Sequence, residues 1–212
     1  MDQYLKEQMG KINSRQEFKF LVSRKELTNI ELFNKNHTKE LYPEREILSL
    51  YMDTSNLELY RLSSLNDVGK FKVRYRTYPN TDQNIYQEVK SNTRFGKEKF
   101  VTKTNFSDLN SIDLIYNSGY ILHPTLFVQY KRKYLQLDNS VRLTIDSNIN
   151  YFLPKFRSLD YSKIAIPHIV LEMKNLDNQK IDLTKYFFSN PVAFSKYNFG
   201  IEKLFSNLIE ST

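Results

Sequence analysis

The segment KFKVRYR, residues 70–76, has a basic residue at every second position and contains no acid. Side chains alternate between the two faces of a β-strand, so the cations would share one face. Phe71, Val73 and Tyr75 would share the other face. A chain with this pattern needs a sheet that separates an ionic face from an apolar one, and the question is which face lies inside the protein.

The same alternation recurs in six other segments that we predict to be strands, namely residues 17–23, 84–90, 97–103, 126–135, 140–146 and 168–174, and residues 46–54 are predicted to form a further strand. On their ionic faces, Arg and Lys outnumber Asp and Glu. One such strand alone is typical of a solvated surface, but a repeated bias toward Arg is typical of phosphate binding. Because an antiparallel sheet can close into a barrel, we predict that the ionic face lines a lumen and that a bound polyanion neutralises its charges.

Helices are predicted between these strands. Ser23 and Glu26 form a capping-box pattern before an apolar-periodic segment, which indicates a helix start. The other predicted helices are a short polar one at 1–13, one capped at 53–55, one at 106–120 and an amphipathic one at 195–210. With no repeat, linker or low-complexity tract, residues 1–212 are predicted to form one α+β domain.

Composition narrows the class of protein. The chain has 212 residues and no cysteine, which excludes disulfides, thiol nucleophiles and cysteine metal sites. No segment approaches the roughly 18 apolar residues of a membrane-spanning helix, and the first residues lack a signal-peptide pattern, so we expect a cytoplasmic protein. The formal net charge of +7 favours an anionic partner, whether nucleotide, polyanion, nucleic acid or membrane surface.

Nine short motifs resemble those of the VTC domain, in the same order and with similar spacing. They are RQEFKF, YMDT, KFKVRYR, QEVK, KEKF, YKRKY, VRLTID, LEMK and FSKY, and together they span about residues 14–205. VTC domains are the polyphosphate polymerase branch of the triphosphate tunnel metalloenzymes, relatives of the CYTH fold. The resemblance implies an antiparallel eight-stranded closed β-barrel, the triphosphate tunnel, with helices packed around it.

The resemblance also implies an activity and its residues. Members with this pattern transfer the γ-phosphoryl group of ATP onto a growing inorganic polyphosphate chain, with Mn2+ or Mg2+ as the divalent cofactor. The residues assigned to catalysis are Lys19, Arg74, Arg76, Lys90, Arg132 and Arg142. Those assigned to substrate binding are Arg15, Lys97, Lys99, Lys174 and Lys196, and those assigned to the metal are Glu172, Glu17 and Glu88.

The first motif departs from the hydrolytic members of the superfamily, which open with E-x-E-x-K. The corresponding positions here are Arg15, Glu17 and Lys19. Replacing a carboxylate by a cation removes a ligand for the second metal that would activate water, and adds a contact for phosphate. The departure favours a polymerase, whose nucleophile is the terminal phosphate of the product chain.

Other functions stay open at the level of sequence. A tunnel triphosphatase could use Glu17, Glu88, Asp146 and Glu172 for two metals. A non-catalytic binder of polyphosphate or inositol phosphates would gain nothing from Glu172 unless that residue serves only in a salt bridge. No nucleic-acid partner is expected, because the aromatic residues mostly share the apolar face. Whether a membrane-protein partner receives the product is not indicated by the sequence.

Overall fold

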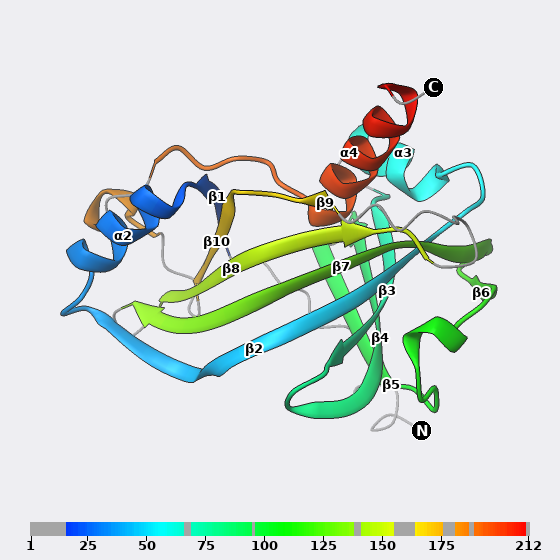
Figure 1. Ribbon diagram of the computed structural model, residues 1–212, viewed down its shortest axis with the longest axis horizontal. Helices are drawn as coiled ribbons and strands as arrows, with labels where there is room; N and C mark the ends of the chain where they lie inside the picture. Colours follow the sequence, from blue (N-terminus) through cyan, green and yellow to red (C-terminus); the bar gives the residue numbers. More distant parts are fainter. Residues whose placement is uncertain are drawn as a thin grey trace.

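The computed structural model describes residues 16–65, 69–94, 96–137, 141–154, 164–175, 181–186 and 189–210. It shows an α+β chain dominated by one antiparallel sheet (Figure 1). The strands are β1 (Glu17–Val22), β2 (Thr38–Asp53), β3 (Phe71–Tyr78), β4 (Asp82–Thr93), β5 (Gly96–Lys103), β6 (Ile115–Asn117), β7 (Tyr120–Leu137), β8 (Val141–Phe152), β9 (Ile164–Ala165) and β10 (Ile169–Asn175). The helices are α2 (Arg24–Phe33), α3 (Glu58–Leu65) and α4 (Lys196–Glu210).

The strand order is β1-β10-β8-β7-β2-β3-β4-β5, with β6 beside β7 and β9 beside β8. The eight strands of this path correspond to the eight strands predicted from the sequence. A closed barrel is not confirmed, because β1 and β5 are the two ends of the path and no ladder joins them within the described residues. The strands β3 to β5 run steeply across β2, β7 and β8, so the sheet curves around one face without closing (Figure 1). We call this the inner face; it carries Arg74, Arg132 and Glu172.

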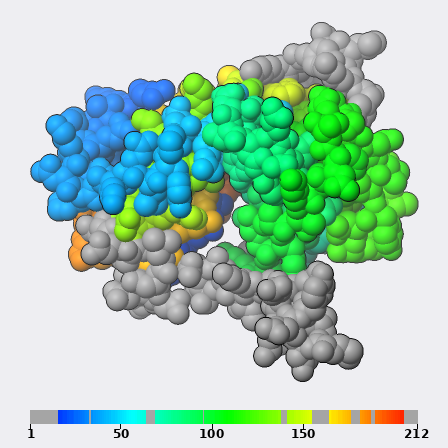
Figure 2. Space-filling model, turned by 90° about the horizontal axis from the view of Figure 1, so that it is seen from below, coloured from blue at the N-terminus to red at the C-terminus, as the bar shows by residue number. Residues whose placement is uncertain are grey.

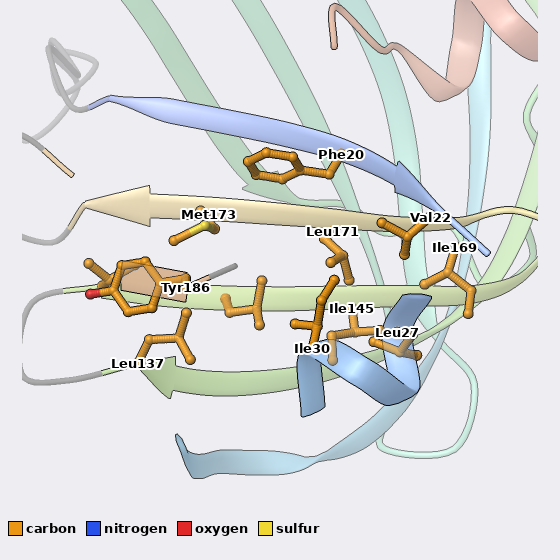
Figure 3. Close-up of a cluster of buried hydrophobic side chains, with 12 residues drawn as sticks. Phe20, Val22, Leu27, Ile30, Leu137, Ile145, Ile169, Leu171, Met173 and Tyr186 are labelled. Atoms are coloured by element: carbon orange, nitrogen blue, oxygen red, sulfur yellow. The ribbon is translucent and has the colours of Figure 1, made fainter. Parts of the chain in front are cut away.

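The outer face is apolar and covered. The helix α2 packs over β1, β10, β8 and β7 in a cluster that includes Phe20, Val22, Leu27, Ile30, Ile145, Ile169, Leu171 and Met173 (Figure 3). The predicted capping box at its start is confirmed. The backbone N–H of Ser23 donates to the Glu26 carboxylate (2.7 Å), and the backbone N–H of Glu26 donates to the Ser23 hydroxyl (3.2 Å). Because the apolar side chains of these strands are buried on the outer face, the ionic side chains of the same strands line the concave inner face.

A second outer cluster covers β2, β3 and β4 and corrects one prediction. Residues 106–120 do not form a helix: they contain a 3-10 turn at Leu109–Ser111 and the strand β6. Leu109 and Ile112 still point into the core, because one 3-10 turn also brings positions i and i+3 to one side. The strand β6 then pairs with β7 through a tight turn in which Ser118 and Gly119 have φ of 49° and 85°. The NSG sequence is a hairpin signal that outweighs the helical spacing.

The helix α4 packs on the inner face, at the end where β2 finishes. Tyr197, Ile201 and Leu204 are buried in a cluster with inner-face residues of β2, β7, β8 and β10. A Cβ atom on Gly200 would lie 2.5 Å from the ring of Tyr151, so this glycine allows the close approach of the helix. The predicted helix at 195–210 is therefore confirmed within one residue, and it closes one end of the inner face with apolar side chains.

The buried carboxylate of Asp53 joins α4 to the rest of the fold. It accepts the backbone N–H groups of Leu59 (2.8 Å) and Tyr60 (2.9 Å) at the start of α3, and the hydroxyl of Tyr197 donates to it. The predicted cap at 53–55 is confirmed by these bonds. The predicted helix at 1–13 lies outside the described residues. None of the helices in the described part of the chain is long and apolar enough to span a bilayer.

Candidate active site

The inner face changes character along the strands. Next to α4 it is apolar; beyond that lies a band of charged side chains; beyond the band lies a rim of tyrosines and Arg45. We call the charged band the ionic band and the rim the mouth, which consists of Arg45, Tyr78, Tyr86 and Tyr134. Seen from below, the molecule is hollowed between the β1 side and the green β4–β5 side (Figure 2).

The first cluster of the ionic band is formed by β3, β4 and β5 around Glu88. The register places Arg74 opposite Glu88, and their side chains form an ion pair with Nη2 to Oε2 at 2.6 Å. Arg76 (3.3 Å) and Lys99 (3.1 Å) bind the same carboxylate. Burial would raise the pKa of Glu88, but these three cations outweigh it and hold the pKa below its usual range. One carboxylate therefore holds three cations side by side.

The two arginines of this cluster are oriented by tyrosines. Arg74 donates to the hydroxyl of Tyr51 (2.9 Å), and Arg76 donates to the hydroxyl of Tyr130 (3.0 Å). Arg76 is 5% exposed and is therefore fixed almost entirely by protein contacts. Such preorganised donors suit a ligand with several anionic oxygens.

The second cluster joins β7, β8 and α4 around Asp146. The carboxylate is fully buried and receives Nε and Nη2 of Arg132 at 2.5 and 2.7 Å. Lys196, at the start of α4, binds the second oxygen at 2.5 Å. Burial alone would raise the pKa of Asp146, but Arg132 and Lys196 outweigh it and lower the pKa. This contact fixes the start of α4 at the ionic band.

The third cluster lies on β1 and β10. Lys174 sits between two carboxylates, with Nζ 2.6 Å from Glu172 and 3.2 Å from Glu17. Lys19 binds Glu17 at 3.3 Å and donates to the carbonyl of Phe194 (3.0 Å). Burial and mutual repulsion oppose ionisation of the two glutamates, yet Lys174 and the other nearby cations lower the pKa of both.

The remaining cations have fewer partners. Within the described residues Arg142 makes no ion pair, and its buried Nε has no hydrogen-bond acceptor. Lys97 is exposed and lies opposite Asn92 at the start of β5. Lys72 binds Ser195 (2.8 Å) and Asn198 (3.4 Å) of the α4 segment. An unpaired buried guanidinium donor is costly, so Arg142 in particular indicates an anionic ligand.

Two lysines of the ionic band titrate near neutrality. The pKa of Lys90 falls to about 7, because desolvation disfavours the ammonium and Arg74 and Lys174 repel it. Solvent still reaches this side chain, as expected for a group that lines a hollow walled by protein. Desolvation is also the main cause that lowers the pKa of Lys72 to about 8. Both amines would regain a proton beside a bound anion.

The residues present fit a divalent metal only in part. Glu17 and Glu172 are held together by Lys174, whereas Glu88 is occupied by Arg74, Arg76 and Lys99. No group of three or more side chains able to hold a metal is found in the described part of the chain. A magnesium-type ion commonly takes one or two carboxylates and completes its shell with water and substrate phosphates. The pair Glu17 and Glu172 fits that kind of site.

The structure thus brings most of the predicted site residues into one ionic band: Lys19, Arg74, Arg76, Lys90, Lys99, Arg132, Arg142, Lys174, Lys196, Glu17, Glu88 and Glu172. Lys97 is on the same face at its margin, and Arg15 lies outside the described residues. The alternation placed Lys72 on this face in phase with Arg74, although Lys72 was not assigned to the site. Sequence reasoning missed Arg45, Tyr51 and Tyr78 as members of this face. Nothing in the sequence pairs Asp146 with Lys196, 50 residues away.

The comparison with protein-family models shows which family this chain belongs to. The family model described as the VTC domain matches residues 14–205. The chain belongs to the VTC domain family. The resemblance seen in the nine sequence motifs is therefore confirmed over nearly the whole chain, while no curated protein matches the sequence.

Several solved structures are similar to this VTC domain. The PH1819 protein from Pyrococcus horikoshii OT3 is similar with a TM-score of 0.54 at 11% identity, over 90% of this chain and 98% of that one. The PH1012 protein from the same organism has a TM-score of 0.47 at 12% identity, over 78% and 80% of the two chains. A putative adenylate cyclase from Vibrio parahaemolyticus has a TM-score of 0.48 at 14% identity, over 84% and 83%. At these identities, the PH1819 match supports the fold alone.

Proposed function

We propose that this VTC domain is a polyphosphate polymerase that transfers the γ-phosphoryl group of ATP onto inorganic polyphosphate with a divalent metal. The observation that carries the proposal is the excess of cations over carboxylates in the ionic band. Glu88 is shared by three cations and Asp146 by two, while Arg142 has no carboxylate partner within the described residues. A band of like charges is stable only when an anion such as a chain of phosphates neutralises it.

The chemistry needs positioning and charge stabilisation more than covalent catalysis. A terminal oxygen of the polyphosphate chain attacks the γ-phosphorus of ATP; a new P–O–P bond forms and the bond to the β–γ bridging oxygen breaks, releasing ADP. Arg74, Arg132 and Arg142 would hold the phosphates and offset the charge on the equatorial oxygens. The nucleophile is already ionised near neutral pH, so no Ser-His-Asp arrangement is required.

The metal site proposed for this reaction consists of Glu172 and Glu17. A bound Mn2+ or Mg2+, held by these two carboxylates, would supply positive charge that offsets the negative charge of the substrate phosphates. Lys174 occupies the space between these carboxylates and would shift toward the phosphates when the metal is held. Glu88, enclosed by three cations, would serve to hold Arg74 and Arg76 in place.

The experiment that tests the proposal is product analysis. Purified protein is incubated with ATP and Mn2+ or Mg2+, and the products are separated on a gel that resolves polyphosphate. Chains that lengthen with time, together with one ADP per phosphate added, support the polymerase. The variant Arg142→Ala should abolish the ladder, whereas Lys133→Ala, which removes an exposed cation from the outer face, should leave it unchanged. An unchanged ladder in Arg142→Ala would overturn the assignment of the site.

The second candidate is a tunnel triphosphatase, and one observation favours it. Glu17 and Glu172 lie close enough to share Lys174, so two carboxylates remain available for metal-activated water. Orthophosphate released in step with ATP or inorganic triphosphate loss, with no ladder at any time, would identify the hydrolase. If neither product forms with either metal, the protein is a binder and both enzymatic proposals fail.

A further inference from the structure

We propose that the hairpin formed by β6 and the start of β7 is a self-association surface, through which two copies of this chain form a symmetric dimer. We call residues 114–122 the hairpin; it lies at the opposite end of the sheet from α2 (Figure 1). The inference is independent of the proposed function, because no residue of the hairpin belongs to the ionic band.

One face of the hairpin is anchored to the core. Leu122 is fully buried, and Ile115 packs against the same outer cluster. The ring of Tyr120 stacks on the ring of Phe71, with centroids 6.3 Å apart. These contacts hold the hairpin in one orientation, so its other face projects away from the core.

The projecting face is apolar although it is exposed. Leu114, Tyr116 and Ile121 are 52%, 73% and 54% exposed. Tyr116 and Ile121 lie directly opposite each other in the register, so their side chains are neighbours on one face. Leu114 comes two residues before Tyr116 and is in phase with it by strand alternation. A contiguous apolar patch in water is typical of an interaction surface.

The backbone of β6 has hydrogen-bonding groups available for a partner strand. The two-residue turn 118–119 has positive φ at both positions, so the flanking pair Asn117 and Tyr120 is the hydrogen-bonded pair. In the next pair, Tyr116 and Ile121, the N–H and C=O groups point away from each other. Within the described residues no strand pairs with the other edge of β6, where the Tyr116 N–H and C=O have no backbone partner.

A two-fold axis at Tyr116 would satisfy this edge. In an antiparallel pairing of two β6 strands about Tyr116, each Tyr116 N–H donates to the C=O of the other Tyr116. The same pairing brings the two Tyr116 rings together, with Leu114 and Ile121 of both copies beside them. One arrangement therefore covers the apolar patch and pairs the open edge.

The hairpin lacks the features that keep edge strands apart. Natural proteins protect edge strands with charged side chains, proline or bulges, and β6 has none of these. Residues 104–130 contain no lysine or arginine, in a chain that has 31 of them and a net charge of +7. Copies that repel each other elsewhere can approach here. The lack of cations, together with the exposed Asp113, argues against an anionic membrane as the partner.

Pairing of two hairpins leaves the ionic band accessible. The register places His123, which follows the hairpin, opposite Asp53 at the end of β2. The hairpin therefore lies at the end of the inner face that α4 covers, and the mouth lies at the other end. Dimerisation and phosphate binding can accordingly be measured, and can fail, separately.

The test is the dissociation constant of the dimer, measured by sedimentation equilibrium of the purified full chain over a range of concentrations. Tyr116→Ala removes the ring and keeps the backbone N–H, whereas Tyr116→Pro removes both. The proline fits this position, because the Tyr116 N–H is not used within the hairpin. The dissociation constant should rise at least about tenfold in Tyr116→Ala, and further in Tyr116→Pro.

A matched control and a second route keep the result interpretable. Leu32→Ala removes an apolar side chain that is 66% exposed on α2 and should leave the dissociation constant unchanged. Ile121→Lys places like charges beside the two-fold axis and should weaken the dimer even if Tyr116→Pro does not fold, as circular dichroism would show.

Two outcomes would overturn the proposal. The first is an unchanged protein that stays monomeric at its highest soluble concentration. The second is a dimer whose dissociation constant is the same in the Tyr116 and Ile121 variants as in Leu32→Ala. A monomer that binds lipid vesicles, and loses that binding in Tyr116→Ala, would assign the apolar patch to a membrane and not to a second copy.

Discussion

Two regions of the inner face, the end covered by α4 and the ionic band, differ in how their side chains are compensated by the protein. At the end covered by α4, the strands present apolar side chains, and Tyr197, Ile201 and Leu204 complete the packing. In the ionic band, the same strands present cations that the few carboxylates do not neutralise, and Arg142 lacks an acceptor for its buried Nε. The first region is satisfied by the protein itself. The second has more cations than its carboxylates neutralise, and we propose it as the functional region.

The largest effect that would sharpen this contrast is expected from Arg74→Ala. Arg74 binds Glu88 and Tyr51 and faces the proposed phosphates, so kcat/KM for ATP should fall by about 100-fold. Arg76 and Lys99 still bind Glu88, so the midpoint of thermal unfolding should change little. The matched control is Lys133→Ala, on the outer face, which should alter neither quantity. A variant that keeps its activity would place the phosphates elsewhere.

The opposite outcome is expected at the end covered by α4. An alanine at Gly200 would bring Cβ within 2.5 Å of the Tyr151 ring and 2.7 Å of Leu126, so the helix must move away from the sheet. We expect Gly200→Ala to lower the free energy of unfolding by about 1–3 kcal/mol, although alanine is the better helix former. Denaturant titration measures this, with exposed Lys203→Ala as the control. If Gly200→Ala is more stable than the unchanged protein, the close approach of α4 is wrong.

A smaller effect concerns the metal. In Glu172→Gln the carboxylate pair is broken, so the metal concentration that gives half-maximal turnover should rise at least about tenfold, an effect seen even for residues that only orient a metal ligand. Glu40→Gln, an exposed substitution on β2, is the control. Metal dependence that is identical in both variants would show that Glu172 serves only in its ion pair with Lys174.

The smallest expected effect is the uptake of protons when triphosphate binds. The pKa of Lys90 is lowered to about 7, so at pH 8 the free protein holds this side chain mostly neutral. A bound polyanion favours the ammonium, so triphosphate binding at pH 8 should take up protons, and affinity should fall as pH rises from 7 to 9. Calorimetry in buffers of different ionisation enthalpy measures the uptake.

The variant Lys90→Met should reduce that uptake, with the remainder coming from Lys72, whose pKa is lowered to about 8. The exposed outer-face control Lys133→Met should leave the uptake unchanged. Proton uptake that is equal in Lys90→Met and the unchanged protein would show that Lys90 does not sense the ligand.

Much of the fold follows from the sequence because alternation is a local property. The eight strands of the sheet path, the capping box at Ser23 and the helix at 195–210 all depend on neighbouring residues. The helix predicted at 106–120 was wrong because a 3-10 turn and a hairpin satisfy the same apolar spacing. The closure of the sheet depends on how the end strands β1 and β5 lie in space, which no local pattern specifies.

The limits of prediction are similar for the site. The alternation along each strand showed which residues share its ionic face, and most of the predicted cations do lie together in the ionic band. Asn148, with φ of 53°, lies where the β7–β8 register shifts, and beyond it Ile149 and Tyr151 join the inner cluster. Alternation from Arg142 to Asp146 would have placed those residues outside. Which cations are paired, as Arg132 is, and which are left without a carboxylate, as Arg142 is, required the three-dimensional arrangement.

The most direct test of the account is a crystal structure of the protein with inorganic triphosphate and Mn2+. We predict phosphate oxygens within hydrogen-bonding distance of Arg74 and of the Nε atom of Arg142, with an anomalous manganese peak beside Glu172. Triphosphate bound only to outer-face lysines such as Lys131 and Lys133, or an inner face without phosphate at saturating concentration, would contradict it.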